Sequence, residues 1–384
     1  MRTRLLIPPL LLLTACSGCR TGIPQRGAPD CILVEDDFGP QASAPLTVDV
    51  VAEGLEVPWG IAWLPGGDAL VTERPGRVRL LRGFALQPTP VATVAIGDSA
   101  EGGLLGIAAH PDFANNRQFY LYVTHEEGGE TKNRVERWVL SEDHASATFE
   151  RVIFGGIEAA TYHNGGRLRF GPDGMLYVGT GDARDPDRAQ DVNVPEGKLL
   201  RLTPEGDIPS DNPFPGKPAF LLGVRNTQGF DWKDADTLYF TDHGPSGERL
   251  RRGHDEVNVA RKGDNLGWPT IYRCESGEGL VTPSLTWETA SPPGGAAIYT
   301  GDAIPEWKGS LLIGSLGSRH LHRVAFSPEN PSQVAQHEVY LRDTYGRLRE
   351  TLMGPDGHLY VTTSNCDGRG DCTARKDLLL RVRR

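Results

Sequence analysis

The sequence contains 384 residues, with 40 lysines and arginines against 50 aspartates and glutamates and a formal net charge of −10 at pH 7. A chain this acidic is a poor candidate for binding nucleic acid or anionic membrane surfaces, so a neutral or small substrate is expected. The length allows a large core, as one big domain or as two or three ordinary ones.

The N-terminus is typical of an exported bacterial protein. A basic start is followed by an apolar run over residues 5–13 that is too short to span a bilayer. Leu13-Thr14-Ala15-Cys16 then resembles a lipobox. We therefore predict a lipoprotein signal peptide over residues 1–15 and lipidation of Cys16, which would be the protein's sole attachment to a membrane. An ordinary secretory signal cut nearby is the alternative.

The segment after the signal is rich in glycine, proline and polar residues, and residues 16–44 are predicted to be a flexible tether. The cysteines fit an oxidising compartment, in which Cys366 and Cys372 would close a short disulfide loop. Metal binding is the alternative, although no histidine or further cysteine lies close by in sequence. The pairing of Cys19, Cys31 and Cys274 stays open, and a bridge from Cys31 to Cys274 is one possibility.

A loose unit recurs along the chain, in which a turn rich in Gly, Pro, Asp and Asn precedes a short apolar strand. Equivalent strand positions are 50, 56, 62, 73 and 48 residues apart, at Leu70, Tyr120, Leu176, Leu238, Leu311 and Leu359. These spacings are typical of propeller blades with loops of varying length. The 47 glycines and 29 prolines also suit many short strands joined by tight turns.

The repeat predicts an all-β chain folded as a six-bladed β-propeller over residues 45–384, with a β-sandwich or two β domains as the alternative. A propeller fold does not name a function, but it directs attention to the loops at one mouth of the central channel. The candidate loops are residues 100–113, 163–168, 189–202, 223–230, 242–245, 255–258, 265–269 and 345–349.

Taken together and in this order, these loops resemble the soluble quinoprotein sugar dehydrogenases, particularly the exported aldose dehydrogenases that use pyrroloquinoline quinone (PQQ). The resemblance covers residues 57–361 and implies the same six-bladed fold. It also implies oxidation of an aldose at the anomeric carbon to a lactone, with a hydride passing to PQQ.

The resemblance implies a role for each of several residues. His163, in His163-Asn164-Gly165-Gly166-Arg167-Leu168, corresponds to the family's general base, a role that a neutral imidazole suits near pH 7. Arg225 and Asn226 correspond to a catalytic and cofactor-binding pair, and Glu101 lies where the family places a polar residue near the cofactor. Arg347 and Arg349 share one face of a strand and correspond to the family's PQQ-binding arginines.

Calcium is the metal that the resemblance implies, since it is a hard cation that takes oxygen ligands. One ion would lie on the backbone carbonyls of Gly244 and Pro245, where it would polarise PQQ. A second ion would use the carboxylate of Glu256 and the carbonyl of Leu266.

The chain departs from the family at two places. Gly317 stands where the family has a lysine that pairs with a PQQ carboxylate, and Arg319 is a candidate to replace that lysine. Residues 246–254 are longer than the family's link and contain three arginines.

The leading hypothesis is a PQQ- and calcium-dependent aldose dehydrogenase attached to the bacterial envelope by lipid and facing the periplasm. Because the sequence has no Cys-x-x-Cys-His haem motif, its electron acceptor (a quinone, a cytochrome or a dye) would be a separate molecule. Two non-redox alternatives remain at this stage, a ligand-binding propeller and a calcium-dependent lactonase.

Overall fold

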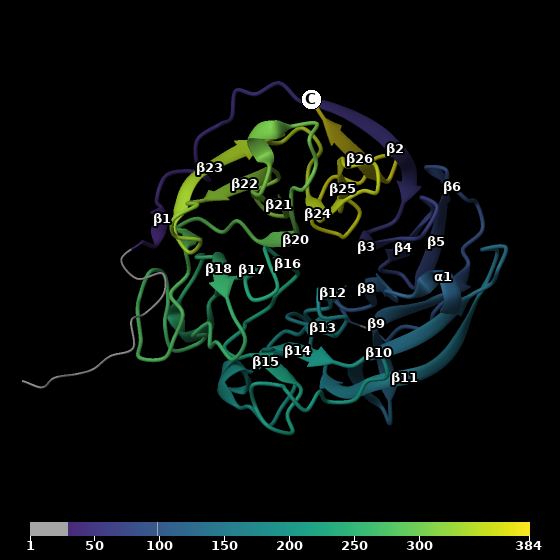
Figure 1. The fold of residues 1–384 in the computed structure, drawn as a ribbon, viewed down its shortest axis with the longest axis horizontal. Helices are drawn as coiled ribbons and strands as arrows, with labels where there is room; N and C mark the ends of the chain where they lie inside the picture. Colours follow the sequence, from purple (N-terminus) through teal and green to yellow (C-terminus); the bar gives the residue numbers. More distant parts are fainter. Residues whose placement is uncertain (1–29, 98) are drawn as a thin grey trace, which may run out of the picture.

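The computed structural model describes residues 30–97 and 99–384, so the predicted signal peptide and Cys16 lie outside the described residues. The described chain folds into six mainly antiparallel sheets arranged in a ring, and each sheet forms one blade (Figure 1). The prediction of an all-β, six-bladed propeller is therefore confirmed. Within the described ranges, no helix is long and apolar enough to cross a bilayer.

Each blade is a meander whose first strand lies next to the channel. The first three blades contain β3 (Pro58–Trp63), β4 (Ala69–Glu73), β5 (Arg77–Arg82), β6 (Ala85–Leu86) and β7 (Ala92–Thr93); β8 (Leu104–Ala109), β9 (Gln118–Glu127), β10 (Glu130–Leu140) and β11 (Ala147–Glu158); and β12 (Leu168–Phe170), β13 (Leu176–Gly179), β14 (Leu199–Leu202) and β15 (Ala219–Leu221). A short helix α1 (Phe113–Asn116) and a 3-10 turn η1 (Pro186–Gln190) lie in their loops.

The last three blades follow the same plan. They contain β16 (Gly229–Trp232), β17 (Leu238–Asp242), β18 (Glu256–Ala260) and β19 (Leu285–Trp287); β20 (Pro293–Ile298), β21 (Leu311–Ser315), β22 (Leu321–Phe326) and β23 (Val334–Tyr340); and β24 (Leu348–Met353), β25 (Leu359–Thr363) and β26 (Asp377–Arg383). Two further 3-10 turns are η2 (Glu248–Leu250) and η3 (Pro305–Trp307). The six repeat positions found in the sequence all fall in second strands, namely β4, β9, β13, β17, β21 and β25.

The ring is closed by a strand from the N-terminal end of the described chain. The outer edge of the sixth blade is β2 (Thr47–Leu55), which pairs antiparallel with β26 through Thr47 opposite Arg383 and Val48 opposite Val382. Figure 1 shows this purple strand lying beside the yellow C-terminal strand. Because the last blade needs a strand from the start of the domain, the two ends of the chain hold each other in place.

The segment before β2 also lies on the propeller. Strand β1 (Ile32–Val34) pairs in parallel with β19, and Cys31 forms a disulfide with Cys274. The predicted tether over residues 16–44 overlaps the described chain from Asp30 onward, and this overlap is not a free linker because strand pairing and a covalent bond hold it. The pairing of Cys31 with Cys274, which the sequence left open, is thereby defined.

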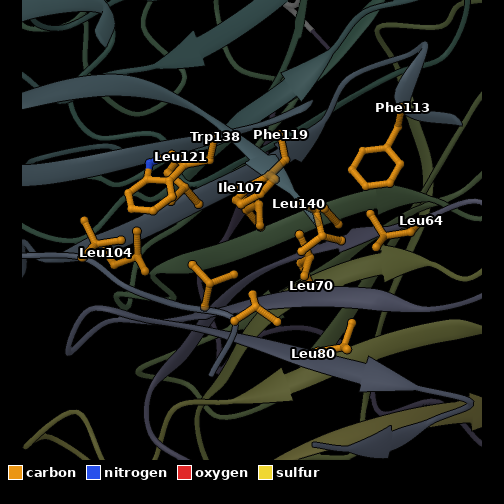
Figure 2. Packing of buried hydrophobic residues seen from close by; sticks show 14 of the residues in the cluster. Leu64, Leu70, Leu80, Leu104, Ile107, Phe113, Phe119, Leu121, Trp138 and Leu140 are labelled. Atoms are coloured by element: carbon orange, nitrogen blue, oxygen red, sulfur yellow. The ribbon is translucent and has the colours of Figure 1, made fainter. Parts of the chain in front are cut away.

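The core consists of one apolar cluster between each pair of neighbouring blades. Alternation along each strand divides its side chains between two such clusters. In β4, for example, Leu70 packs toward the second blade, whereas Ala69 and Val71 pack toward the sixth. Figure 2 shows the cluster between the first and second blades, to which Leu70 and Leu80 of the first blade and Leu121 and Trp138 of the second all belong. Such packing on both faces fixes the blades as a rigid ring around the channel.

Candidate active site

A cavity of about 520 Å³ lies at one mouth of the channel. Its polar walls come from two sets of segments. One set leads into the innermost strands, at Glu101, His163, Arg225 and Arg347, and the other follows the second strands, at Arg74, Arg184, Glu248 and Asp367. Equivalent loops of successive blades therefore contribute the site residues. This repetition brings together side chains that are far apart in the sequence, as expected for the mouth of a propeller.

His163 is held by a buried carboxylate. Its Nδ1 lies 2.7 Å from Oδ1 of Asp182, and Oδ2 of Asp182 accepts a hydrogen bond of 2.9 Å from Nε1 of Trp268. Because a carboxylate accepts, the proton of a neutral imidazole is assigned to Nδ1, and Nε2 keeps a lone pair. His163 also lines the cavity, so this nitrogen can act there as a base.

The backbone at His163 takes a conformation that is uncommon for a residue with a side chain. Its φ is +68°, and Gly165 and Gly166 follow with φ of +63° and +113°. A Cβ on Gly165 would lie 2.5 Å from backbone atoms of Gly179 and Thr180, so glycine is required at this turn. The backbone therefore bends sharply after the histidine, and such strain is common at functional sites.

The Arg225-Asn226 pair is positioned by Asp242 at the end of β17. The two carboxylate oxygens of Asp242 each accept a backbone N–H at 2.7 Å, one from Arg225 and one from Asn226. The side-chain Oδ1 of Asn226 accepts the N–H of Gly165 at 2.9 Å. The third and fourth blades are thus linked directly beside His163.

Arg347 and Arg349 share one carboxylate, as the strand alternation predicts. Arg347 donates to Oδ2 of Asp367 through Nε and Nη2 at 3.0 and 2.9 Å, and Arg349 donates to the same oxygen at 3.4 Å. Arg349 also donates to Oε1 of Gln228 at 3.0 Å. Burial lowers the pKa of Arg349 to about 10, which leaves it cationic at neutral pH.

The C-terminal disulfide loop forms part of the site. Cys366 and Cys372 are bonded, as predicted, and Asp367 and Arg369 lie between them. Arg369 donates to Oε1 of Glu101 at 2.7 Å, while Oε2 of Glu101 lies 3.3 Å from the backbone nitrogen of His163. Burial alone would raise the pKa of Glu101, but the guanidinium of Arg369 outweighs it and the pKa is lowered. Glu101 is therefore an ionised carboxylate.

Residues 246–254 place a third carboxylate in the cavity. Oε1 of Glu248 accepts a hydrogen bond from Nη2 of Arg225 at 2.8 Å and lies 3.7 Å from Nε2 of His163. Burial raises and Arg225 lowers the pKa of Glu248, with a lowered pKa as the net result. The long link therefore contributes a charged group beside the two residues expected to be catalytic.

The predicted metal ligands offer oxygen atoms that no hydrogen bond uses. No donor among residues 30–97 and 99–384 reaches the carbonyl oxygens of Gly244, Pro245 or Leu266. Near Glu256, Oδ1 of Asn258 is buried without a partner, and Nδ2 of the same amide donates to Oε2 of Glu256 at 3.2 Å. In the described chain, no three His, Cys, Asp or Glu side chains converge on a metal position. A cation here would depend on backbone carbonyls as much as on Glu256.

The comparisons with known proteins agree with this geometry. A family profile described as "Glucose / Sorbosone dehydrogenase" matches residues 55–380. The chain belongs to this family. It is 32% identical to the aldose sugar dehydrogenase YliI of Escherichia coli, over 85% of this chain and 92% of that protein. It is 26% identical to quinoprotein glucose dehydrogenase B of Acinetobacter calcoaceticus, over 87% of this chain and 88% of the relative.

A solved structure shares both the sequence and the fold. The PQQ-bound aldose sugar dehydrogenase from Streptomyces coelicolor is 35% identical, covers 88% of this chain and 98% of its own, and superposes with a TM-score of 0.78. The resemblance inferred from the loops is therefore confirmed at the level of the glucose/sorbosone dehydrogenase family.

Arg319, the candidate to replace the family's lysine, lies outside this cavity. Nε of Arg319 lies 2.9 Å from Oδ1 of Asp343, both side chains are about half exposed, and neither lines the cavity. The different register of Arg319 turns its side chain away from this cavity, so its replacement of the lysine stays a prediction. Arg74 lines the cavity instead, and its Nη2 lies 3.5 Å from the backbone oxygen of Asp367. The site thus obtains an additional cation from the first blade.

Several site residues were missed from the sequence, namely Arg74, Asp182, Gln228, Glu248, Asp367 and Arg369. Two of these residues could have been found from their position in the sequence. Asp182 ends the same glycine-rich stretch that begins at His163, and Asp367 lies inside the predicted disulfide loop. The others belong to the site only because the propeller brings their loops to one mouth, and a single sequence does not predict that arrangement.

Proposed function

We propose that the protein oxidises aldose sugars at the anomeric carbon to lactones, with PQQ as the electron acceptor and calcium as its metal partner. The observation that carries this proposal is the charge of the cavity. Its walls contain six arginines and three carboxylates, an excess of three positive charges, namely Arg74, Arg184, Arg225, Arg347, Arg349 and Arg369 against Glu101, Glu248 and Asp367. PQQ is a planar molecule with three carboxylates, so the donor set fits its charge.

The apolar walls fit a flat ring system as well. Trp59, Pro292 and Leu316 line the same cavity as the arginines. Arg347, Arg349 and Asn226 would hold the cofactor, with Gln228 and Arg74 as further donors and Glu101 at its edge. When bound, PQQ supplies a two-electron acceptor for the hydride of the anomeric carbon.

The protein's own part in the reaction is proton removal and charge stabilisation. Nε2 of His163 takes the proton of the anomeric hydroxyl, and the buried Asp182 stabilises the imidazolium that results. Arg225 lines the same cavity and stabilises negative charge that develops at the reacting oxygen atoms. The buried position of His163 limits the water that competes for its lone pair.

Calcium is supported by the free oxygens described above. The carbonyls of Gly244 and Pro245 would hold one ion near the cofactor, and Glu256 with the carbonyl of Leu266 would hold a second. Burial and repulsion from Asp242 raise the pKa of Glu256 to about 8, so an isolated carboxyl there is unfavourable as an anion. A divalent cation would offset that cost.

Export and attachment complete the proposal. Two disulfides fit an oxidising compartment. We propose that Cys16 carries the lipid that holds the protein at the periplasmic side of the envelope. Electrons would then leave through a separate acceptor such as a quinone or a cytochrome.

Reconstitution tests the function directly. The protein without its signal peptide is incubated with calcium, with or without PQQ, and dye reduction is followed over a panel of aldoses. Reduction that requires PQQ is the expected result. A folded protein that does not bind PQQ in an absorbance titration would refute the proposal and favour a non-redox propeller, either a binding protein or a lactonase.

A further inference from the structure

Glu248 occupies a position that the reaction as described does not explain. It lies in residues 246–254, and its carboxylate contacts both proposed catalytic residues. Oε1 lies 2.8 Å from Nη2 of Arg225 and 3.7 Å from Nε2 of His163, while Oε2 accepts the N–H of Ser246 at 2.6 Å. The loop therefore holds one carboxylate oxygen next to the nitrogen that accepts the substrate proton.

The proton taken up by His163 needs a way out. Nδ1 of His163 faces Asp182, whose side chain is fully buried and occupied by Trp268, so no exit leads in that direction. Nε2 faces the cavity, which bound cofactor and sugar would fill. The side chain of His163 is 8% exposed, whereas that of Glu248 is 24% exposed. Glu248 thus reaches from the buried imidazole to solvent.

We propose that Glu248 carries the substrate proton from Nε2 of His163 to solvent in every turnover. This inference rests on the proposed function, because it needs a hydroxyl proton delivered to His163. It deepens that function by assigning the proton exit to a group on the long link.

The proton moves in three successive transfers. The substrate's O–H bond breaks and an Nε2–H bond forms, while the hydride leaves the anomeric carbon with its electron pair for the two-electron acceptor. The Nε2–H bond then breaks and an Oε1–H bond forms on Glu248, which leaves a neutral His163. Water finally removes that proton and restores the carboxylate, so no further oxidant or reductant is required.

The surroundings of Glu248 suit a short-lived proton carrier. Arg225 keeps the carboxylate ionised before each transfer, so the group is ready to accept and holds the proton only briefly. The distance to Nε2 exceeds a hydrogen bond by roughly 0.5–1 Å, which a small side-chain rotation would close once the imidazole is positively charged.

The other carboxylates of the cavity are less suited to this role. Glu101 pairs with Arg369 and contacts only the backbone nitrogen of His163, and Asp367 is shared by Arg347 and Arg349. His243 is also near, but burial lowers its pKa to about 3, and its Nε2 lies 2.6 Å from the carbonyl of Pro293. It is therefore neutral and already hydrogen-bonded.

The loop itself is braced. Ser246 pairs with Arg252 across its base, and Arg251 donates to the carbonyl of Pro269 at 2.8 Å. Its tip, Leu250, is completely exposed. A change at Leu250 therefore alters the loop without touching the site, which makes Leu250→Ala a matched control for Glu248→Gln.

The test compares wild type, Glu248→Gln and Leu250→Ala, each loaded with calcium and PQQ. Three quantities are measured: the Kd of PQQ by absorbance titration, the single-turnover reduction of bound PQQ by glucose, and steady-state dye reduction with and without imidazole buffer. For Glu248→Gln we expect a Kd within about twofold of wild type and a single turnover that stays fast. Steady-state kcat should fall roughly 10- to 100-fold and recover with imidazole, which replaces the missing carrier. Leu250→Ala should match wild type throughout.

Three outcomes would overturn the proton exit. These are an unchanged kcat in Glu248→Gln, a reduced kcat that small buffers do not rescue, and a variant that binds PQQ at least about tenfold more tightly and turns over faster. The last result would show that Glu248 occupies the guanidinium of Arg225 and competes with PQQ for it. Failure of the proposed function is distinguishable, because wild type itself would then not reduce bound PQQ with any aldose.

Discussion

Asp182 accepts a hydrogen bond from Nδ1 of His163 at 2.7 Å, and the two residues come from opposite ends of one glycine-rich stretch. The strand hairpin of β12 and β13 returns the chain so that the aspartate lies beneath the histidine. Gly181 allows this approach, because a Cβ there would lie 2.0 Å from the carbonyl oxygen of His163. The orientation of the proposed base is thus set by a local turn within one blade.

Asp182→Asn tests the role of that carboxylate. The asparagine amide can donate to Nδ1, which moves the imidazole proton to Nε2 and removes the lone pair from the cavity. We expect kcat for aldose oxidation to fall roughly 10²- to 10⁴-fold, with PQQ affinity retained. In His163→Ala, kcat should fall by a similar amount. Near-normal turnover in either variant would show that another group is the base.

Arg347→Ala tests cofactor binding. The variant removes a guanidinium that donates two hydrogen bonds to Asp367 and that we propose pairs with a PQQ carboxylate. We expect the Kd of PQQ to rise roughly 10- to 100-fold in an absorbance titration. Arg74→Ala should weaken binding in the same direction. Arg319→Ala is the matched control, since Arg319 pairs with Asp343 outside the cavity, and it should bind PQQ like wild type.

The two disulfides should have different effects. Replacing Cys366 and Cys372 by serine frees the loop that positions Asp367 and Arg369, so PQQ affinity should drop about tenfold or more. Replacing Cys31 and Cys274 by serine removes a long-range crosslink whose cysteines do not line the cavity, and it should cost about 2–5 kcal/mol of unfolding free energy with little change in PQQ affinity. Equal losses of PQQ affinity in both variants would contradict this division.

Removal of calcium should destabilise the folded protein. A cation that binds only the native state raises Tm, so a chelator should lower Tm and added calcium should restore it. In Glu256→Gln this dependence on calcium should weaken, because the proposed carboxylate ligand is lost. Glu278→Gln, a change at an exposed carboxyl, serves as the control and should keep the wild-type response. A wild-type Tm that does not respond to calcium would refute the metal assignment.

Buried histidines in the fifth blade predict a loss of stability in acid. Burial lowers the pKa of His320 to about 4 and that of His322 well below its ordinary value. Because the unfolded chain then binds more protons than the folded one, stability is intact above about pH 6.5 and falls as the pH drops toward 4. The slope approaches about 1.4 kcal/mol per pH unit for each such histidine.

Chemical denaturation at several pH values measures that slope. In His322→Gln, the difference in unfolding free energy between pH 6.5 and pH 4 should be smaller than in wild type. Comparison of the two proteins cancels contributions from carboxyl groups that titrate in both. An identical pH dependence would show that His322 is protonated in the native state.

The sequence predicted the architecture because strand and turn patterns are local. Each unit has a turn followed by alternating apolar residues, and the six positions from Leu70 to Leu359 fall in the second strand of successive blades. The Cys366–Cys372 bond was predictable for the same reason, since its partners lie six positions apart. Closure of the ring by β2 was not predicted, because that pairing joins opposite ends of the chain.

The features of the candidate site also fall into two groups, those set by neighbouring residues and those set by the packing of the blades. The sequence by itself determined the blade repeat, the Cys366–Cys372 loop and the shared face of Arg347 and Arg349, all of which follow from neighbouring residues. Only the tertiary structure decided that Asp367 lies beneath both arginines, that Arg319 points away, and that Glu248 reaches Arg225 and His163. Those contacts depend on how six blades pack into a ring and where each loop falls at its mouth, and that packing is a property of the whole chain.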